Sequence, residues 1–327
     1  MVKMSEFPRF VSKQFGKLIP VQSLLKLNTP VFLPFYHVVS NKKLPHIVNY
    51  NYRNIARFEN ELDFYLKHFK PVSLSELISI KNTREKIFHL SFDDGLKECA
   101  EIISPVLLRK GIPATFFVNT GFVDNQRLFH KYKASLIFNR LNEISFPKAE
   151  QILKRHNLNG NEILRVSFLQ ENILDEVAAE IEIDFNDFLK NQKPYLTTKH
   201  LLQLKTEGFS IGAHSFSHPE FWKISENEQL DEVKKSMHWL VDKINPEIKA
   251  FSFPFTDSGV SHHVLNTLKS EKICDVTFGT AGIKYDEFDF HFQRYPVEKE
   301  GDFMLNLKEE LVYFWLRKLI GKATVKH

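Results

Sequence analysis

The chain has 327 residues, of which 43% are hydrophobic and 26% charged, and its formal net charge is +4. This composition excludes an intrinsically disordered chain and is sufficient for one large domain with a full core. Cys99 and Cys274 lie too far apart in sequence for a metal-binding or redox motif, so we expect two buried thiols in a reducing compartment. Basic residues outnumber acidic ones in both terminal segments rather than along one recognition element, which argues against nucleic-acid binding.

Residues 1–30 predict an amphipathic helical segment. Its apolar residues recur every three to four positions, and Arg9, Lys13 and Lys17 lie outside that stripe. The stripe consists of Phe7, Phe10, Val11, Phe15, Leu18 and Ile19. Packing on the domain and binding to an anionic membrane surface are both open. The segment has no continuous apolar run followed by a small-residue cleavage site, so we predict neither a signal peptide nor a transmembrane span and expect a cytoplasmic protein.

Strands and helices alternate over residues 31–300, which is typical of a parallel sheet. The predicted strands are residues 31–37, 87–92, 114–119, 209–214, 251–255, 276–280 and 291–297. The clearest helices between them are residues 58–69, 96–110, 197–207, 225–244 and 261–269. The pattern of residues 124–193 predicts helices without strands, and we interpret these residues as an insertion within a single α/β domain. A basic amphipathic helix within residues 301–327 is predicted to place Leu307, Leu311, Phe314, Trp315 and Leu319 on one face.

Two adjacent carboxylates, Asp93 and Asp94, follow the second predicted strand, and Gly95 supplies the turn there. Side chains alternate in a strand, so neighbouring aspartates can share a site only where the strand gives way to a turn. Two carboxylates held together repel each other unless a cation or a shared proton lies between them. The pair therefore predicts either a cation site or an exposed turn.

His214 and His218 end the fourth predicted strand, four residues apart. With 14 histidines in the chain this spacing carries little weight alone, but in a parallel barrel both strand ends open on the same face. Two histidines and one carboxylate are a common ligand set for a catalytic zinc or a similar divalent ion. The second aspartate is then available as a base.

These motifs resemble those of the polysaccharide deacetylases, family 4 of the carbohydrate esterases, with the nodulation-factor deacetylase homology domain. The resemblance rests on Ser91-Phe92-Asp93-Asp94-Gly95, on His214-Ser215-Phe216-Ser217-His218, and on residues 111–118 between them. It implies a distorted (β/α) barrel of seven or eight strands with a metal at its mouth. It further implies that Asp94, His214 and His218 hold a divalent ion, zinc above all, and that Asp93 is the general base.

The third motif of this family matches residues 252–255, which implies that the backbone N–H of Phe255 stabilises an oxyanion. The chain departs from the family here, because Ser252 stands where an arginine usually orients the base. Arg294 in the last predicted strand is a candidate for that work, and a surface ion pair is its alternative role.

The late histidine motif that supplies the general acid is missing after residue 297. Some relatives instead begin with a strand ending in Tyr-His, which Tyr36 and His37 resemble. His37 is therefore our candidate for protonating the leaving amine, with a core histidine as the alternative and His291 in reserve. Asp257, just after the third motif, could contact substrate hydroxyls or close a turn.

Together these inferences predict a metal-dependent hydrolase that removes an acyl group, N-acetyl first, from an amino sugar of a glycan or lipid-linked saccharide. A sugar O-acetyl esterase or deformylase would use the same site. A carbohydrate-binding homologue that has lost turnover is the rival from another class, suggested by the missing arginine and the missing histidine. The basic terminal helices also offer peripheral contact with the inner face of the membrane.

Overall fold

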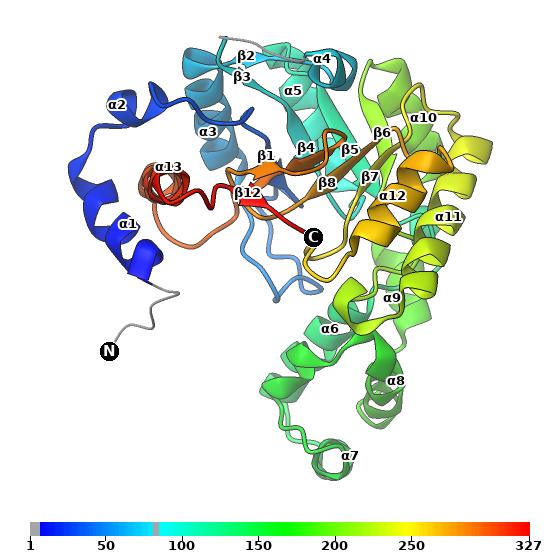
Figure 1. Ribbon diagram of the computed structural model, residues 1–327. Helices are drawn as coiled ribbons and strands as arrows, with labels where there is room; N and C mark the ends of the chain where they lie inside the picture. The colour runs from blue at the N-terminus through cyan, green and yellow to red at the C-terminus, as the bar shows by residue number, and fades with distance from the viewer. Residues whose placement is uncertain (1–6, 81–84) are drawn as a thin grey trace.

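The computed structural model describes residues 7–80 and 85–327, so residues 1–6 of the predicted N-terminal segment lie outside the described residues. Figure 1 shows strands at the centre with helices around them. The strands are β1 (Pro34–Tyr36), β2 (Lys70–Pro71), β3 (Ile87–Phe88), β4 (Leu90–Phe92), β5 (Ala114–Val118), β6 (Ser210–Ala213), β7 (Ala250–Ser252), β8 (Val276–Gly279), β9 (Tyr285–Asp286), β10 (His291–Gln293), β11 (Tyr295–Pro296) and β12 (Thr324–Val325). The α-helices are α1 (Phe7–Leu18), α2 (Val21–Leu25), α3 (Ile55–His68), α4 (Leu74–Ser79), α5 (Ser104–Lys110), α6 (His130–Glu143), α7 (Pro147–Arg155), α8 (Glu171–Glu180), α9 (Phe185–Gln192), α10 (Thr198–Thr206), α11 (Glu226–Lys243), α12 (His262–Ser270) and α13 (Phe303–Leu319).

Eight strands form one sheet in the order β10-β8-β7-β6-β5-β4-β1-β11, and every pair in it is parallel. The two strands at its ends, β10 and β11, are consecutive in the chain and are separated only by Arg294. The sheet therefore closes almost completely into a barrel, which confirms the predicted (β/α) barrel. Its strands are buried and rich in apolar residues, as a sheet covered on both faces requires, but they also bury polar side chains such as Ser91, Ser252 and Thr277.

Several predicted elements differ from the observed ones. The predicted strand 87–92 is interrupted at His89, because β3 pairs with β2 in a small separate sheet whereas β4 pairs with β1 and β5. The predicted strand 291–297 is divided at Arg294 between the two ends of the barrel sheet.

The predicted helix 96–110 begins later and in another form, with a π-helical turn at Cys99–Ile103 before α5. Pro105 in the first turn of α5 has no N–H, so the regular hydrogen-bond ladder cannot run through it.

Helices α6 to α9 lie within residues 124–193 and project to one side of the barrel (Figure 1). Apolar residues of α6, α7 and α8, together with Ile163 from the segment between α7 and α8, form a separate buried cluster that includes Ile137, Leu153 and Leu174.

The terminal helices α1 and α13 pack against each other, but not through the predicted stripes. Helix α1 buries Ser12 and Gly16, and a Cβ added at Gly16 would meet the backbone nitrogen of Glu309 at 3.1 Å. The close approach of the two helices thus uses the small residues of α1, and Phe10, Phe15 and Leu18 are exposed. In α13, Leu307, Leu311 and Phe314 are buried as predicted, whereas Trp315 and Leu319 are exposed.

None of the helices in the described part of the chain combines the length and the apolarity needed to cross a bilayer.

Candidate active site

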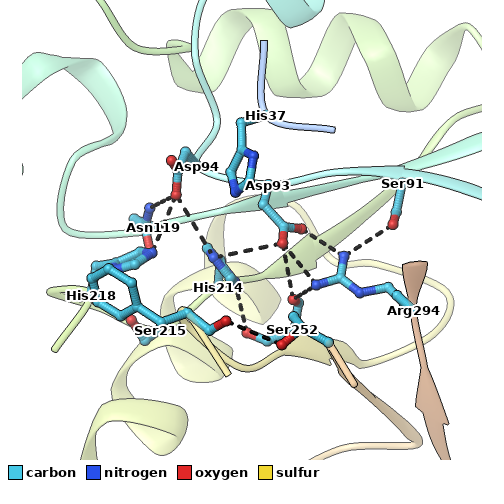
Figure 2. A network of polar contacts seen from close by, with 12 residues as sticks. His37, Ser91, Asp93, Asp94, Asn119, His214, Ser215, His218, Ser252 and Arg294 are labelled. Carbon is cyan, nitrogen blue, oxygen red and sulfur yellow. Dashed lines mark hydrogen bonds and ion pairs between the residues drawn. The ribbon is translucent and has the colours of Figure 1, made fainter. Parts of the chain in front are cut away.

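The polar residues predicted from the strand ends gather at one end of the barrel (Figure 2). His37 follows β1, Asp93 and Asp94 follow β4, and His214 follows β6. The parallel register places these positions side by side, since Tyr36 pairs with Phe92. In a parallel barrel the carboxyl ends of the strands and the loops after them carry the functional residues.

Asp94, His214 and His218 each offer a ligand atom, and these three atoms lie within 4.8 Å of one another. Asp94 Oδ1 lies 3.3 Å from His218 Nε2 and 3.7 Å from His214 Nε2. His214 Nδ1 donates to the carbonyl oxygen of Ser252 at 2.8 Å, so its lone pair is on Nε2 and faces the carboxylates.

The protonation states of this group suit a metal ion. Burial lowers the pKa of His214 to about 4, so its imidazole is neutral at pH 7. Burial opposes ionisation of Asp94, but contacts with His218 and the nearby His37 hold the pKa of Asp94 well below its usual value. A carboxylate and two imidazoles, all buried and with ligand atoms within 4.8 Å of one another, fit a zinc-class ion.

Asp93 is held by Arg294 in a buried, two-point ion pair. Arg294 Nη1 donates to Asp93 Oδ1 at 2.8 Å and Nη2 donates to Oδ2 at 2.7 Å, with both side chains at most 2% exposed. Arg294 also donates to the hydroxyls of Ser91 and Ser252. Burial alone would raise the pKa of Asp93, but the guanidinium holds this pKa below its usual value. The alternative role of Arg294 in a surface ion pair is therefore wrong. Arg294 contacts the Asp93 carboxylate and also the hydroxyl of Ser252, the residue that stands in place of the usual arginine.

His37 lies beside the two aspartates (Figure 2). Its Nδ1 is 2.5 Å from Glu298 Oε2. Glu298 also accepts hydrogen bonds from the backbone N–H groups of His37 and Val38. Burial opposes protonation of the imidazole, but the Glu298 carboxylate raises the pKa of His37 to about 9. At neutral pH His37 is therefore charged and one-quarter exposed, which does not fit a core histidine.

Four residues at this end of the barrel have left-handed backbone conformations although they carry side chains. They are Asp94 at φ 70°, Ser215 at φ 71°, His218 at φ 57° and Phe255 at φ 57°. Such conformations are costly for non-glycine residues and concentrate at functional sites. Gly95 continues the turn at φ 67°, where a Cβ would lie 2.9 Å from Val118 Cγ1, so the tight turn after the aspartates requires glycine.

Phe255 stacks edge-on against His218, with ring centroids 4.5 Å apart. Its backbone N–H donates no hydrogen bond within residues 7–80 and 85–327. The predicted strand 251–255 ends early, because β7 stops at Ser252. Pro254 and Phe255, with its left-handed backbone, lie beyond the strand. A donor is therefore available next to a candidate metal ligand.

The structure does not bring every predicted residue to this group. His291 bonds through its two ring nitrogens to Thr277 and Asp257, in a cluster that shares no ligand with Asp94. The reserve role of His291 as the acid is therefore not supported. Asp257 closes a turn, one of its two predicted roles, because its carbonyl oxygen accepts from the backbone N–H of Val260 at 3.0 Å, and its side chain is buried in that second cluster.

Sequence reasoning missed four residues around the aspartates. Asn119 donates to Asp94 Oδ1 at 3.4 Å, and Tyr132 donates to Asp94 Oδ2 at 3.1 Å. The ring of Tyr50 contacts that of His37 at a tilt, and Glu298 pairs with His37. Asn119 and Glu298 follow closely on β5 and β11, so their positions after strand ends were a usable signal. The two tyrosines come from a loop and from the insertion, where no pattern points to them.

Several solved structures share this fold. The structure of IcaB from Ammonifex degensii is 13% identical, with 87% of this chain and 98% of that chain covered and a TM-score of 0.57. The Streptococcus pyogenes deacetylase PplD in complex with acetate is 15% identical, with 86% and 97% covered and a TM-score of 0.55. Polysaccharide deacetylase BC0361 from Bacillus cereus is 15% identical, with 85% and 68% covered and a TM-score of 0.52.

No curated protein sequence matches this chain. The sequence model of the family described as polysaccharide deacetylase matches residues 80–273, which is more than half of the chain. This match includes both aspartates, both histidines and the third motif. The chain therefore belongs to the polysaccharide deacetylase family.

Proposed function

We propose that this protein is a metal-dependent hydrolase that removes an acyl group, N-acetyl first, from an amino sugar. The proposal rests on two arrangements of side chains that lie next to each other at the end of β4. Asp94 converges with His214 and His218, while Asp93 next to it is ionised and fixed by Arg294. One carboxylate is thus placed for a metal and the other for a proton.

Asp94, His214 and His218 would hold the ion, for which the donor set favours zinc. A bound divalent ion lowers the pKa of water and polarises the acyl oxygen. Asp93 accepts the proton of the attacking water, and Arg294 keeps Asp93 ionised and oriented. The free N–H of Phe255 donates to the oxyanion that develops on the acyl group. Cleavage then requires a proton for the leaving nitrogen.

His37 supplies that proton in our proposal. Its pairing with Glu298 keeps the imidazole protonated at neutral pH, as a general acid requires. An amine is a poor leaving group unless it is protonated, so a charged imidazole beside the base favours amide over ester hydrolysis. The carbohydrate-binding homologue without turnover is disfavoured, since Arg294 and His37 occupy the two roles whose usual residues are missing.

Replacing Glu298 by glutamine is expected to shift the alkaline limb of kcat/KM to lower pH. His37 can donate only below its pKa, so wild-type activity should fall as the pH rises through about 9. Glutamine can still accept from the backbone, but it removes the charge that raises the pKa of His37. The measurement is a pH profile of kcat/KM, with Glu300→Gln, an exposed neighbour, as the control. An unchanged limb in Glu298→Gln would exclude His37 as the acid.

The substrate that we propose is an amino-sugar glycan or a lipid-linked saccharide. The related PplD was solved with acetate, the product expected of N-deacetylation. Trp222 and Phe255 are 46% and 37% exposed and lie edge to face, with ring centroids 5.8 Å apart, so they offer a surface on which a sugar ring can stack.

Acetate release tests the proposed reaction. Purified protein with zinc should release acetate from N-acetylglucosamine oligomers faster than from O-acetylated sugars. The reverse order would assign the same site to an O-acetyl esterase. Release from neither, with metal bound, would contradict deacetylation of these sugars.

We propose further that the chain is organised as a terminal helical segment (1–30), a barrel (31–300) with an insertion (124–193), and a C-terminal helix (301–327). The two terminal helices present apolar side chains beside basic ones. Phe10, Phe15 and Leu18 are 50–79% exposed in α1, next to Lys13 and Lys17, and Trp315 and Leu319 are exposed in α13. This combination matches an anionic membrane surface such as the inner face of the cell membrane.

Sedimentation with vesicles tests this contact. The protein should sediment with vesicles containing anionic lipid at low salt, and Lys13→Glu/Lys17→Glu should weaken that binding several-fold. Lys148→Glu, an exposed lysine in the insertion, is the matched control and should bind normally. Absence of wild-type binding at low salt would contradict the contact.

A further inference from the structure

A second cluster of potential metal ligands lies outside the candidate active site. Asp257, Asp286, His291 and His327 each offer one ligand atom, and all four atoms lie within 4.8 Å of one another. The cluster shares no residue with Asp94, His214 and His218. Any ligand that it holds would therefore be additional to the catalytic one.

The four residues come from two parts of the fold. Asp257 lies in the loop after β7, and His291 lies in β10 of the barrel sheet. Asp286 belongs to β9, which pairs with β12, and His327 follows β12 by two residues. The cluster thus joins the barrel to the small two-stranded sheet.

The two carboxylates of this cluster have only histidines as charge partners among the described residues. The four side chains are at most 3% exposed. In the part of the chain that the structure describes, the only ion-pair partners of Asp257 and Asp286 are His291 and His327, with no lysine or arginine among them. Buried carboxylates require a compensating charge. A divalent ion would neutralise both carboxylates and leave both imidazoles neutral.

The imidazoles are oriented for such an ion. His327 Nδ1 donates to the carbonyl oxygen of Val260 at 3.3 Å, which directs Nε2 at Asp286 Oδ2, 3.1 Å away. His291 Nδ1 bonds to the hydroxyl of Thr277 at 2.8 Å, and its Nε2 lies 3.1 Å from Asp257 Oδ2. Both Nε2 atoms therefore face the carboxylates, as they do in metal sites whose outer ring nitrogen is fixed by an oxygen.

The carboxylates are held by further hydrogen bonds. Gln293 Nε2 donates to Asp286 Oδ2 at 2.9 Å and to Asp257 Oδ2 at 2.5 Å. Asp257 Oδ1 accepts from the backbone N–H of Thr280 at 3.2 Å. Asp257 and His327 also line an open cavity of about 340 Å³, through which an ion could enter. Oriented ligands, an outer layer of hydrogen bonds and an entry path are what a metal site needs.

We propose that Asp257, Asp286, His291 and His327 bind a second zinc-class ion in a four-ligand structural site. Two nitrogens and two oxygens form a closed set without a position for substrate. The ion would fix β9 and β12 against the loop that carries both Asp257 and Phe255. Thr280 links these two residues, because its backbone N–H donates to Asp257 Oδ1 and its hydroxyl donates to the carbonyl oxygen of Phe255. Its role is to hold the fold rather than to take part in hydrolysis.

Metal content of the full chain tests the proposal. After dialysis against zinc, the wild type should contain two equivalents, and Asp286→Asn/His327→Gln should contain one fewer. The control Asp289→Asn, an exposed carboxylate close by in sequence, should match the wild type. An unchanged content in Asp286→Asn/His327→Gln would overturn the proposal and leave an ion pair of the protonated histidines.

A second variant covers the case in which Asp286→Asn/His327→Gln fails to fold. Asp94→Asn/His218→Gln lacks two catalytic ligands, so one retained equivalent and a rise in Tm on adding zinc would place that ion in the second cluster. No retained zinc and no rise in Tm would overturn the proposal. A wild type with one equivalent, lost only in Asp286→Asn/His327→Gln, would instead contradict the catalytic metal and leave the second site intact.

Discussion

Replacing Asp93 by asparagine is expected to lower kcat by about 10²–10⁴-fold, the contribution of a positioned general base. Asparagine keeps the shape of the side chain but cannot accept the proton of water. The metal ligands are untouched, so the variant should still bind zinc. Steady-state kinetics of acetate release, together with metal content, measures both effects.

Asp94→Asn is the matched comparison, because it changes the neighbouring carboxylate in the same way. It should lose activity together with zinc affinity, since Asp94 lies between the two imidazoles. If Asp93→Asn retained wild-type kcat, or if it lost zinc as Asp94→Asn should, the division of roles between the two aspartates would be contradicted.

Replacing Arg294 by methionine is expected to lower the free energy of unfolding by about 3–5 kcal/mol, because it leaves the buried Asp93 carboxylate without its partner. The pKa of Asp93 should rise, since burial alone disfavours its charge. The base must be ionised to act, so the acidic limb of kcat/KM should move to higher pH. Arg294→Lys should give an intermediate result, because lysine keeps the charge but not the two-point contact. Urea denaturation and pH profiles measure the two effects separately.

Arg53→Met is the control for stability. Arg53 is equally buried and pairs with the buried Glu61 at 2.8 Å, away from the catalytic carboxylates. It should destabilise the protein comparably without moving the acidic limb. If the acidic limb of kcat/KM did not move in Arg294→Met, Arg294 would stabilise the fold without affecting the base.

The barrel and the grouping of its polar strand ends were predictable because both follow from local patterns. Apolar runs between helices indicate a parallel sheet, and the carboxyl ends of such strands meet at one end. His37, Asp93 and His214 could be assigned to one site on that basis. Arg294 could be proposed because Ser252 stands where an arginine is expected, although its contact with Asp93 depends on the closure of the sheet between β10 and β11.

Other features depend on contacts between distant parts of the chain, which the sequence pattern does not encode. The pairing of His37 with Glu298 brings together residues 261 positions apart. Helix α1 buries Ser12 and Gly16 because small residues allow α13 to approach closely, so Phe10, Phe15 and Leu18 of its predicted apolar stripe are exposed. The predicted strand 251–255 stops at Ser252, because Pro254 and the left-handed backbone of Phe255 do not continue it. That backbone conformation belongs to the site and does not follow from strand propensity.

The most direct test of the proposed hydrolysis is removal and return of the metal in the wild type and in Asp94→Asn. Chelation should abolish acetate release from N-acetylglucosamine oligomers by the wild type, and added zinc should restore it. Zinc should not restore activity in Asp94→Asn, although the protein remains folded. Acetate release that persists in the fully metal-free wild type, or that zinc restores equally in Asp94→Asn, would contradict a catalytic ion held by Asp94, His214 and His218.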